Sequence, residues 1–470
     1  MSDEDENRHF FVRLRKSSAT LSFFDELFSG NDVADLRPKK KSEGSAERSE
    51  PPEEKSLFDP IVERFWDDLE HLVEGTQFLT QTTSSLMEPV FSRISENFLK
   101  KHGSLISDRG RHRLYALPRQ QRVALYNLIE DRRRAGRFVE QIPNILLPTL
   151  VSHIETLLFS TIRALIKKNP AMIGNVNREF SLTELHQLKS IEQLRDEIID
   201  THIRSIMGGS HLSQIEWIEK KTKINFEFDD AILRNFKRMC LTRNIIIHNA
   251  GQVSQQFYED MKELGNEISP DDIGKAVRIP IDVFRSDVET SIIIGVVISQ
   301  MVWRKVDKPK TAQVDVWVTN ISYTLIKDGR YGTAAKLLEM CNKKIEHWED
   351  SWAKHAAIVN SANAQRLLGN RDKALEVLSS IQWKTMSLQL QMCVNAIRGD
   401  FDECTKLLET HGTSVDIGAA DYHEWPVFDE LREHVPFQEA FVRKFGEPIG
   451  GKAYVGAAER SQSEAPNDLN

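Results

Sequence analysis

The 470-residue chain has few cysteines and none of the arrangements through which cysteine commonly shapes a protein. A disulfide scaffold needs a high density of cysteine, and a structural zinc site needs Cys and His at short, regular spacings. The chain has four cysteines, without a C-x-x-C pair or a histidine at ligand spacing: Cys240, Cys341, Cys393 and Cys404. The sequence therefore predicts no disulfide framework, no metal site and no cofactor.

The short motifs that mark several large enzyme classes are also missing. The chain contains no G-x-x-x-x-G-K-[ST], no G-x-G-x-x-G after a strand pattern, no G-x-S-x-G and no H-E-x-x-H. In other proteins these motifs hold nucleotide phosphates, dinucleotides, a nucleophilic serine and a catalytic zinc ion. Nucleoside triphosphatase, dehydrogenase, serine hydrolase and zinc protease functions consequently have no support.

Long hydrophobic runs are absent as well. The most apolar window, Ile292–Trp303, is much shorter than the roughly 20 residues of a bilayer span, so we expect a buried helix there. The first ten residues, MSDEDENRHF, are acidic and lack the apolar core of a secretory signal. We therefore expect a cytoplasmic protein with no membrane association. With 62 Lys and Arg against 70 Asp and Glu, any nucleic-acid surface must be local.

Strand signals are almost absent, whereas helical periodicity is common. Apolar residues recur at spacings of three or four, as at Phe58, Ile61, Val62, Phe65 and Leu69. Pro148 suits the first position of a helix, where its missing N–H costs nothing, and predicts a helix over 148–168. Further helices are expected at 182–206, 211–222, 229–248 and 283–303. The predicted fold class is all-α.

Composition divides the chain into five regions. Residues 1–55 are highly charged and rich in Ser and Pro toward their end, so we expect a mostly disordered arm there. Residues 445–470 are expected to be a disordered tail. Between them we expect a helical N-terminal region over 56–142, a helical domain over 143–305, and helical repeats with a capping helix over 306–444.

The third helical region carries a weak internal repeat. Glycine recurs at Gly329, Gly369 and Gly399, and five positions later a small residue follows each time: Ala334, Ala374 and Cys404. Such a glycine ends one helix in the left-handed conformation, and the small residue lets the next helix pack closely. The pattern resembles the tetratricopeptide repeat, although the offsets are 40 and 30 residues. Its stacked helix pairs would bind a protein partner on a concave surface, or would only pack on the preceding domain.

The segment Leu241–Gly251, LTRNIIIHNAG, places an Arg, an Asn and a His near the end of an apolar helix. A guanidinium can hold two phosphate oxygens and stabilise the charge that develops in a transition state. An imidazole can accept a proton from a ribose 2′-hydroxyl or donate one to a leaving oxygen. Arg243 and His248 are therefore candidates for RNA phosphodiester chemistry, whereas the plainer alternative is that His248 only caps a helix.

The same segment, with the helices around it, resembles the HEPN superfamily (the higher eukaryotes and prokaryotes nucleotide-binding fold), whose motif is R-N-x-x-x-H. The resemblance covers about 143–305 and is closest to a subgroup found in bacterial conflict and restriction-linked proteins. It implies that Arg243 and His248 are the catalytic pair of a metal-independent endoribonuclease. It also implies that Asn244 is the family's polar position and that Glu155 is its acidic residue on an earlier helix.

Residues 109–137 hold nine arginines against two acidic residues, a marked local excess in an acidic protein. Aromatic side chains lie between them, and Arg with interleaved aromatics suits phosphate contact and base stacking. We assign RNA binding to the following arginines: Arg109, Arg111, Arg113, Arg132, Arg133, Arg134 and Arg137. The alternative is a solvated helix face that pairs with acidic neighbours.

Together these observations predict a metal-independent endoribonuclease that cleaves single-stranded RNA through 2′-hydroxyl attack. The resemblance adds bacterial defence or a toxin–antitoxin system as the setting. The alternative function is a non-catalytic adaptor that dimerises and binds RNA or a protein partner.

We also expect a homodimer in which two copies of the motif face one cleft. The apolar faces of helices 148–168 and 283–303 are larger than one small bundle needs, which would leave area for a two-fold interface. The alternative is that the rest of the same chain covers these faces.

Overall fold

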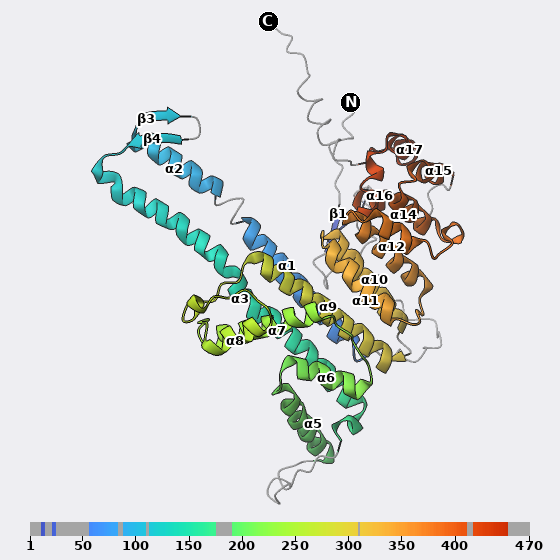
Figure 1. Ribbon diagram of the computed structural model, residues 1–470. Coiled ribbons are helices and arrows are strands. Elements are labelled where there is room, and N and C mark those ends of the chain that lie inside the picture. The colour runs from blue at the N-terminus through green and yellow to red at the C-terminus, as the bar shows by residue number, and fades with distance from the viewer. Residues whose placement is uncertain are drawn as a thin grey trace, which may run out of the picture. The chain divides into compact units, whose positions relative to one another are not determined.

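A computed structural model gives the fold of the chain (Figure 1). It describes the following residues: 11–14, 21–24, 56–82, 88–109, 112–174, 190–308, 311–410 and 417–449. The described chain is mostly helical, in agreement with the predicted class. It divides into two compact units: Ser56–Val314, which we call the bundle unit, and Asp315–Asn470 with Met1–Lys55, which we call the repeat unit. Most of the predicted disordered arm and tail lies outside the described residues.

The bundle unit is built around one very long helix, α3, which contacts α1, α7 and α9. Its helices are α1 (Asp59–Thr82), α2 (Glu88–His102), α3 (Arg122–Lys168), α5 (Ile191–Met207), α6 (His211–Thr222), α7 (Asp230–His248), α8 (Gln255–Glu263) and α9 (Ile281–Val306). The predicted helices at 211–222, 229–248 and 283–303 are confirmed to within three residues at each end. Part of the predicted helix 182–206 lies outside the described residues, and α5 accounts for its second half.

The predicted start of a helix at Pro148 is wrong, because α3 begins at Arg122 and continues through Pro143 and Pro148. A proline inside a helix removes a hydrogen bond, and tertiary packing must compensate for it. Asn144 supplies part of that packing. Its Nδ2 donates to the Val277 carbonyl oxygen at 2.7 Å, and its Oδ1 accepts from the Ile279 N–H at 3.0 Å. The predicted boundary between residues 142 and 143 therefore falls inside a continuous helix.

The core of the bundle unit lies along the second half of α3 and along α9, which α1 flanks in Figure 1. The apolar stripe of α3 is fully buried, and so is most of the 292–303 segment of α9, as predicted. Gly295 permits the close approach of α1, since a Cβ there would lie 2.0 Å from Phe65 Cζ. The two apolar faces expected to form a dimer interface are thus covered within the chain, and that argument for the interface is wrong.

By length and apolar composition, one helix among the described residues, within Arg119–Lys168, could cross a membrane. Its apolar second half packs in the core of the bundle unit, and core helices of soluble proteins pass the same test of length and composition.

Two antiparallel hairpins interrupt the helical pattern, and the sequence did not predict them. Strands β3 (Ser104–Arg109) and β4 (His112–Ala116) pair between α2 and α3, and β1 (Phe11–Leu14) pairs with β2 (Leu21–Phe24). The residues that join β3 to β4 in the sequence are Gly-Arg, which is not the Asn-Gly or Asp-Gly pair typical of tight hairpins. Leu105 and Leu114 are exposed, so β3 and β4 lack the buried face that creates an alternating pattern.

The helices described in the repeat unit form three pairs, and two further helices follow them. The pairs are α10 (Thr311–Lys327) with α11 (Tyr331–Lys344), α12 (Ser351–Leu367) with α13 (Arg371–Leu378), and α14 (Leu388–Arg398) with α15 (Phe401–Thr410), before α16 (Ala419–Glu424) and α17 (Val435–Phe445). Gly329, Gly369 and Gly399 have φ values of 76°, 83° and 82°, which confirms the predicted left-handed turns. The small residue after each turn is buried. The resemblance to tetratricopeptide repeats stays a prediction.

Candidate functional site

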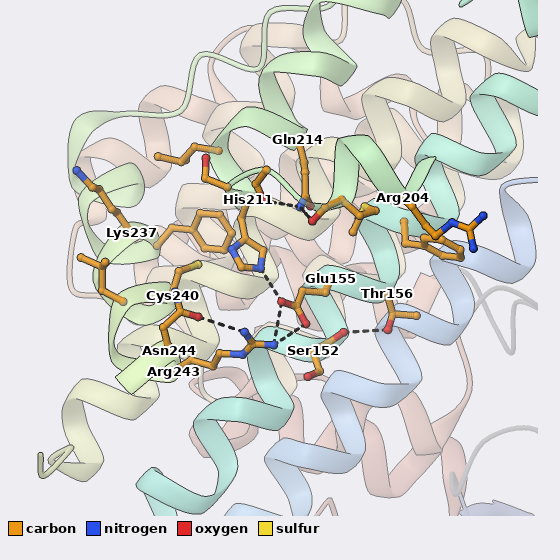
Figure 2. A pocket seen from close by; sticks show the side chains of 17 residues that line it. Ser152, Glu155, Thr156, Arg204, His211, Gln214, Lys237, Cys240, Arg243 and Asn244 are labelled. Carbon is orange, nitrogen blue, oxygen red and sulfur yellow. Dashed lines mark hydrogen bonds and ion pairs between the residues drawn. The ribbon is translucent and has the colours of Figure 1, made fainter. Parts of the chain in front are cut away.

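A cavity of about 700 Å³ opens in the bundle unit among α3, the turn from α5 to α6, and α7 (Figure 2). Three predicted site residues line it: Glu155 of α3 and Arg243 and Asn244 of α7. His211, the first residue of α6, lines it too, although the sequence did not single it out. The cavity is therefore the place where the structure brings three of the four predicted catalytic residues together.

Local sequence explains why α7 presents Arg243 to this cavity. Asp229 caps the helix, its Oδ1 accepting from the Ile232 N–H at 2.8 Å. Ile232, Phe236 and Met239 follow at spacings of three and four and are buried, which fixes the rotation of α7 against the core.

The start of α6 is fixed by a tight turn at Gly208 and Gly209. A Cβ at Gly209 would lie 2.6 Å from Ser213 Oγ, so a larger residue there would displace the turn. Ser210 caps the helix, its Oγ accepting from the Ser213 N–H at 3.1 Å. The turn and the cap place the next residue, His211, on the cavity wall.

The Glu155 carboxylate joins the side chains of His211 and Arg243. His211 Nε2 lies 2.8 Å from Glu155 Oε1, and Arg243 Nη2 lies 3.0 Å from both carboxylate oxygens. Arg243 Nη1 also donates to Asn244 Oδ1 at 3.1 Å. Figure 2 shows these side chains converging from α3, α6 and α7. The hydrogen bond from His211, together with the charge of Arg243, lowers the pKa of Glu155 despite its partial burial.

An ionised Glu155 determines which nitrogen of His211 carries a proton. A carboxylate only accepts hydrogen bonds, so Nε2 must be the donor in this contact. We assign the Nε2–H proton of His211 from this network. Within the described part of the chain, Nδ1 of His211 has no hydrogen-bond partner.

The lining of the cavity has an excess of positive charge. Arg204, Lys237 and Arg243 line it, and Glu155 is its one carboxylate. Arg243 contacts this carboxylate, whereas the charged ends of Arg204 and Lys237 point away from it in Figure 2. Arg204 Nη2 donates to Thr201 Oγ1 at 3.2 Å, and Lys237 has no ion-pair partner among the described residues.

Cys240 also lines the cavity, but its thiol is not activated. Burial and the neighbouring Glu155 charge raise the pKa of Cys240 to about 12, and Arg243 offsets this only in part. A thiol with such a pKa carries almost no thiolate near neutral pH, so cysteine nucleophilic chemistry is not supported at this site.

His248 lies outside the cavity lining, exposed at the last residue of α7. It follows Arg243 by five residues, which is about 7.5 Å along a helix axis. The residues after it form a helix end: the N–H groups of Asn249 and Gly251 both donate to the Ile245 carbonyl oxygen at 2.9 Å. Ala250 and Gly251 have φ values of 49° and 71°, so the Asn-Ala-Gly sequence acts as a left-handed cap.

The chain after this cap pairs with the segment before α9. Gln252 and Ala276 form an antiparallel bridge, and the Val253 N–H donates to the Lys275 carbonyl oxygen at 2.9 Å. The Val277 N–H in turn donates to the Gly251 carbonyl oxygen at 2.8 Å. Since Asn144 binds the backbone at Val277, the end of α7 is tied to α3 through this segment.

A second arginine of α7 pairs with a carboxylate, but deep in the core. Arg238 is 8% exposed and forms an ion pair with the fully buried Asp287 of α9. Asn235 Oδ1 accepts from Arg238 Nε at 3.1 Å and Nη2 at 2.7 Å. Burial raises the pKa of Asp287 to about 7, an effect that Arg238 opposes. None of the residues that line the cavity around Glu155 takes part in this network.

The arginines predicted to bind RNA lie on β3, β4 and the first half of α3. Arg111 and the side chain of Arg109 lie outside the described residues. Several others pair with acidic neighbours, namely Arg113 with Glu96 at 3.3 Å, Arg133 with Glu130 at 2.8 Å, Arg134 with Asp131 at 3.7 Å and Arg137 with Glu130 at 3.7 Å. These pairs agree with the alternative of a solvated, ion-paired face, although Tyr126 and Phe138 are exposed beside them.

Of the predicted site residues, the structure brings together Glu155, Arg243 and Asn244 at the cavity, which His248 does not line. His211 was missed because 56 residues separate it from Glu155, and no short spacing links the two. The one local signal was a histidine placed directly after the Gly-Gly-Ser helix start. Among the described residues, no group of three or more His, Cys, Asp and Glu could hold a metal ion.

No family model matches the chain, and comparisons with curated proteins and with solved structures likewise give no match.

Proposed function

We propose that the bundle unit is a metal-independent endoribonuclease that cleaves single-stranded RNA. The observation that carries the proposal is the contact of Arg243 with Glu155 and, through it, with an imidazole, in a cavity with excess positive charge. These are the groups that 2′-hydroxyl attack on a phosphodiester requires. The R-N-x-x-x-H motif supports the same chemistry through its resemblance to HEPN ribonucleases, which also suggests a role in bacterial defence.

In the proposed reaction the ribose 2′-oxygen attacks the adjacent phosphorus, and the bond from phosphorus to the 5′-oxygen breaks. The 2′-hydroxyl proton passes to an imidazole, and the departing 5′-oxygen takes up a proton. Arg243 stabilises the negative charge that builds on the phosphorane oxygens. The products carry a 2′,3′-cyclic phosphate and a 5′-hydroxyl, and His248 is the proton acceptor that the motif suggests.

The test uses purified protein with end-labelled single-stranded RNA in the presence of EDTA. The expected result is cleavage by the wild type, cyclic phosphate ends, and strong loss of cleavage in Arg243→Ala. RNA with 2′-deoxyribose at the cleaved position should resist. Cleavage of that RNA, or a requirement for added magnesium, would refute the mechanism.

A second candidate function is the non-catalytic adaptor, which a groove in the repeat unit favours. The groove encloses about 220 Å³ and is lined by Trp352, Trp425 and amide side chains that include Asn320 and Asn360. Trp352 is 43% exposed, as suits a residue that packs against a protein partner. Equal RNA cleavage traces for wild type and Arg243→Ala would favour this function.

Homodimerisation belongs to either proposal, and light scattering at micromolar concentration tests it. Ile247 and His248 are exposed at the end of α7, where a second protomer could bring its own motif close. A particle of 53.9 kDa that still cleaves RNA would exclude a site shared between protomers.

A further inference from the structure

The cavity contains its own imidazole, so the proton acceptor need not come from the exposed end of α7. His211 lies on the cavity wall and is 14% exposed in its side chain, whereas His248 is an exposed residue that does not line the cavity. A group that transfers a proton must lie within hydrogen-bond reach of the reacting oxygen. Position therefore favours His211 for any ligand that occupies the cavity.

The geometry places His211 and Arg243 within reach of one phosphodiester. Both contact Glu155 Oε1, His211 Nε2 at 2.8 Å and Arg243 Nη2 at 3.0 Å, so the imidazole and the guanidinium lie beside the same carboxylate. Arg243 can therefore hold the phosphate while the imidazole faces the ribose.

The contact with Glu155 prepares the imidazole for this task. The carboxylate accepts from Nε2–H and leaves the Nδ1 lone pair without a partner among the described residues. After proton transfer, the same carboxylate stabilises the imidazolium, as a buried carboxylate does in hydrolase triads. The hydrogen bond and the Arg243 charge that lower the pKa of Glu155 keep it ionised for both purposes.

The charged and titratable groups around His211 come from three helices. Glu155 belongs to α3, Arg204 to α5, and Lys237, Cys240 and Arg243 to α7. Lys237 has no ion pair among the described residues.

We propose that His211 is the group that accepts the 2′-hydroxyl proton, that Glu155 positions it, and that Arg243 binds the scissile phosphate. This inference rests on the proposed ribonuclease function and identifies the working side chains of its site. The proton leaves the 2′-oxygen for Nδ1 of His211 as the new bond to phosphorus forms, the bond from phosphorus to the 5′-oxygen breaks, and the 5′-oxygen takes up a proton from water.

The lining also indicates the class of RNA. Phe159 lies in the wall and is 37% exposed, so its ring is available to a base. Only an unpaired base can stack on a side chain in this way. The substrate is therefore a single-stranded segment with one base unstacked beside the cleaved bond.

The test compares single-turnover cleavage of labelled single-stranded RNA by the full-length wild type, His211→Ala, His211→Gln and His248→Ala. Glutamine can still donate to Glu155 but cannot take up a proton, so it separates folding from catalysis. His202→Ala is the matched control, because His202 lies on the neighbouring α5 and does not line the cavity. Binding of 2′-deoxy oligonucleotide, followed by fluorescence anisotropy, reports whether the cavity is intact.

Both His211 variants are expected to lose at least about 100-fold in rate, while His211→Gln binds the 2′-deoxy oligonucleotide nearly as the wild type does. Added imidazole should restore part of the cleavage to His211→Ala and none to Arg243→Ala. Loss in His248→Ala as well would make the two histidines base and acid of one reaction and would support the proposal.

Two results overturn the proposal, and they can be told apart. If the wild type cleaves RNA and both His211 variants cleave like His202→Ala, His211 has no role while the ribonuclease function stands. If the wild type cleaves no RNA, the function and this inference fail together.

Discussion

Two arginines on α7, five positions apart, each contact a carboxylate, yet their surroundings give them different roles. Arg238 and Asp287 are buried between α7 and α9, and Asn235 completes the network. Arg243 and Glu155 are partly exposed at the cavity and share their contact with His211. The pKa of the carboxyl group rises in the first pair, where burial dominates, and falls in the second, where hydrogen bonds dominate. Burial, rather than residue type, separates a pair that holds helices together from one that can meet a ligand.

The strongest test of this contrast is the stability of the two carboxylate variants. Asp287→Ala leaves the buried Arg238 without its charge partner, and breaking such a pair typically costs about 3–5 kcal/mol. Glu155→Ala should lower the free energy of unfolding by only about 1 kcal/mol, because its pair is partly solvated. Urea unfolding at pH 8, followed by circular dichroism, measures both. Equal losses would show that the two pairs do not differ in the way proposed.

The next largest effect concerns activity. Arg243→Ala should reduce single-turnover RNA cleavage by about 100- to 1000-fold, as does removal of a group that stabilises a transition-state oxyanion. Arg234→Ala is the control, since Arg234 is an arginine of α7 that does not line the cavity. If the cleavage rate decreases to a similar extent in both variants, the loss comes from a general disturbance of α7 and not from the role of Arg243.

A smaller effect appears in the pH dependence of stability, where the two pairs should have opposite signs. The folded pKa of Asp287 lies above its unfolded value of 3.8, so its stabilising contribution is complete below pH 3.8 and is lost as pH rises to about 7. Glu155 has a lowered pKa, so its contribution is complete above about pH 4.5 and is lost as pH falls through the folded pKa.

Thermal unfolding between pH 3 and pH 8 measures these contributions. Asp287→Asn should flatten the profile between pH 4 and pH 7, and Glu155→Gln should reduce the acid limb below pH 4.5. For one proton, the free energy of unfolding can change by at most about 1.4 kcal/mol per pH unit in either case. If Asp287→Asn and the wild type show the same dependence of thermal stability on pH, the pKa of Asp287 is not raised.

The smallest effect is expected for the exposed pair of Arg134 and Asp131 on the first half of α3. Arg134→Ala removes the contact with Asp131 and should change the free energy of unfolding by less than about 0.5 kcal/mol. If this face also binds RNA, the triple variant of Arg132, Arg133 and Arg134 should weaken RNA binding and reduce its salt dependence. If the triple variant binds RNA with the affinity of the wild type, this face is a solvated, ion-paired surface without a role in RNA binding.

Local patterns in the sequence predicted much of this fold. The starts of α6 and α7 carry capping residues, α9 follows from its apolar run, and the left-handed turn at Gly329 and its two counterparts follows from glycine placement. Pro148 misled the prediction, because the contacts of Asn144 with a segment about 130 residues away keep the helix continuous. The hairpin of β3 and β4 was missed because it buries no face.

The candidate site was only partly predictable, because it too depends on contacts between residues that are far apart in the sequence. The motif identified Arg243 and Asn244, and the resemblance added Glu155, all of which line the cavity. His211 could not be found from spacing, because only the packing of α6 against α3 brings it to Glu155. His211 is largely buried at the cavity and His248 is exposed. The sequence alone does not reveal this difference in exposure.

The double attachment of α7 to α3 has a mechanical consequence. One attachment is the contact of Arg243 with Glu155, and the other runs from the cap after His248 through the 276–277 backbone to Asn144. The two helices and the two attachments form a closed frame, in which one attachment remains when the other is broken. A ligand that draws Arg243 away from Glu155 therefore does not release the end of α7. A site held in this way changes little in shape on binding, so it selects ligands that already fit the cavity.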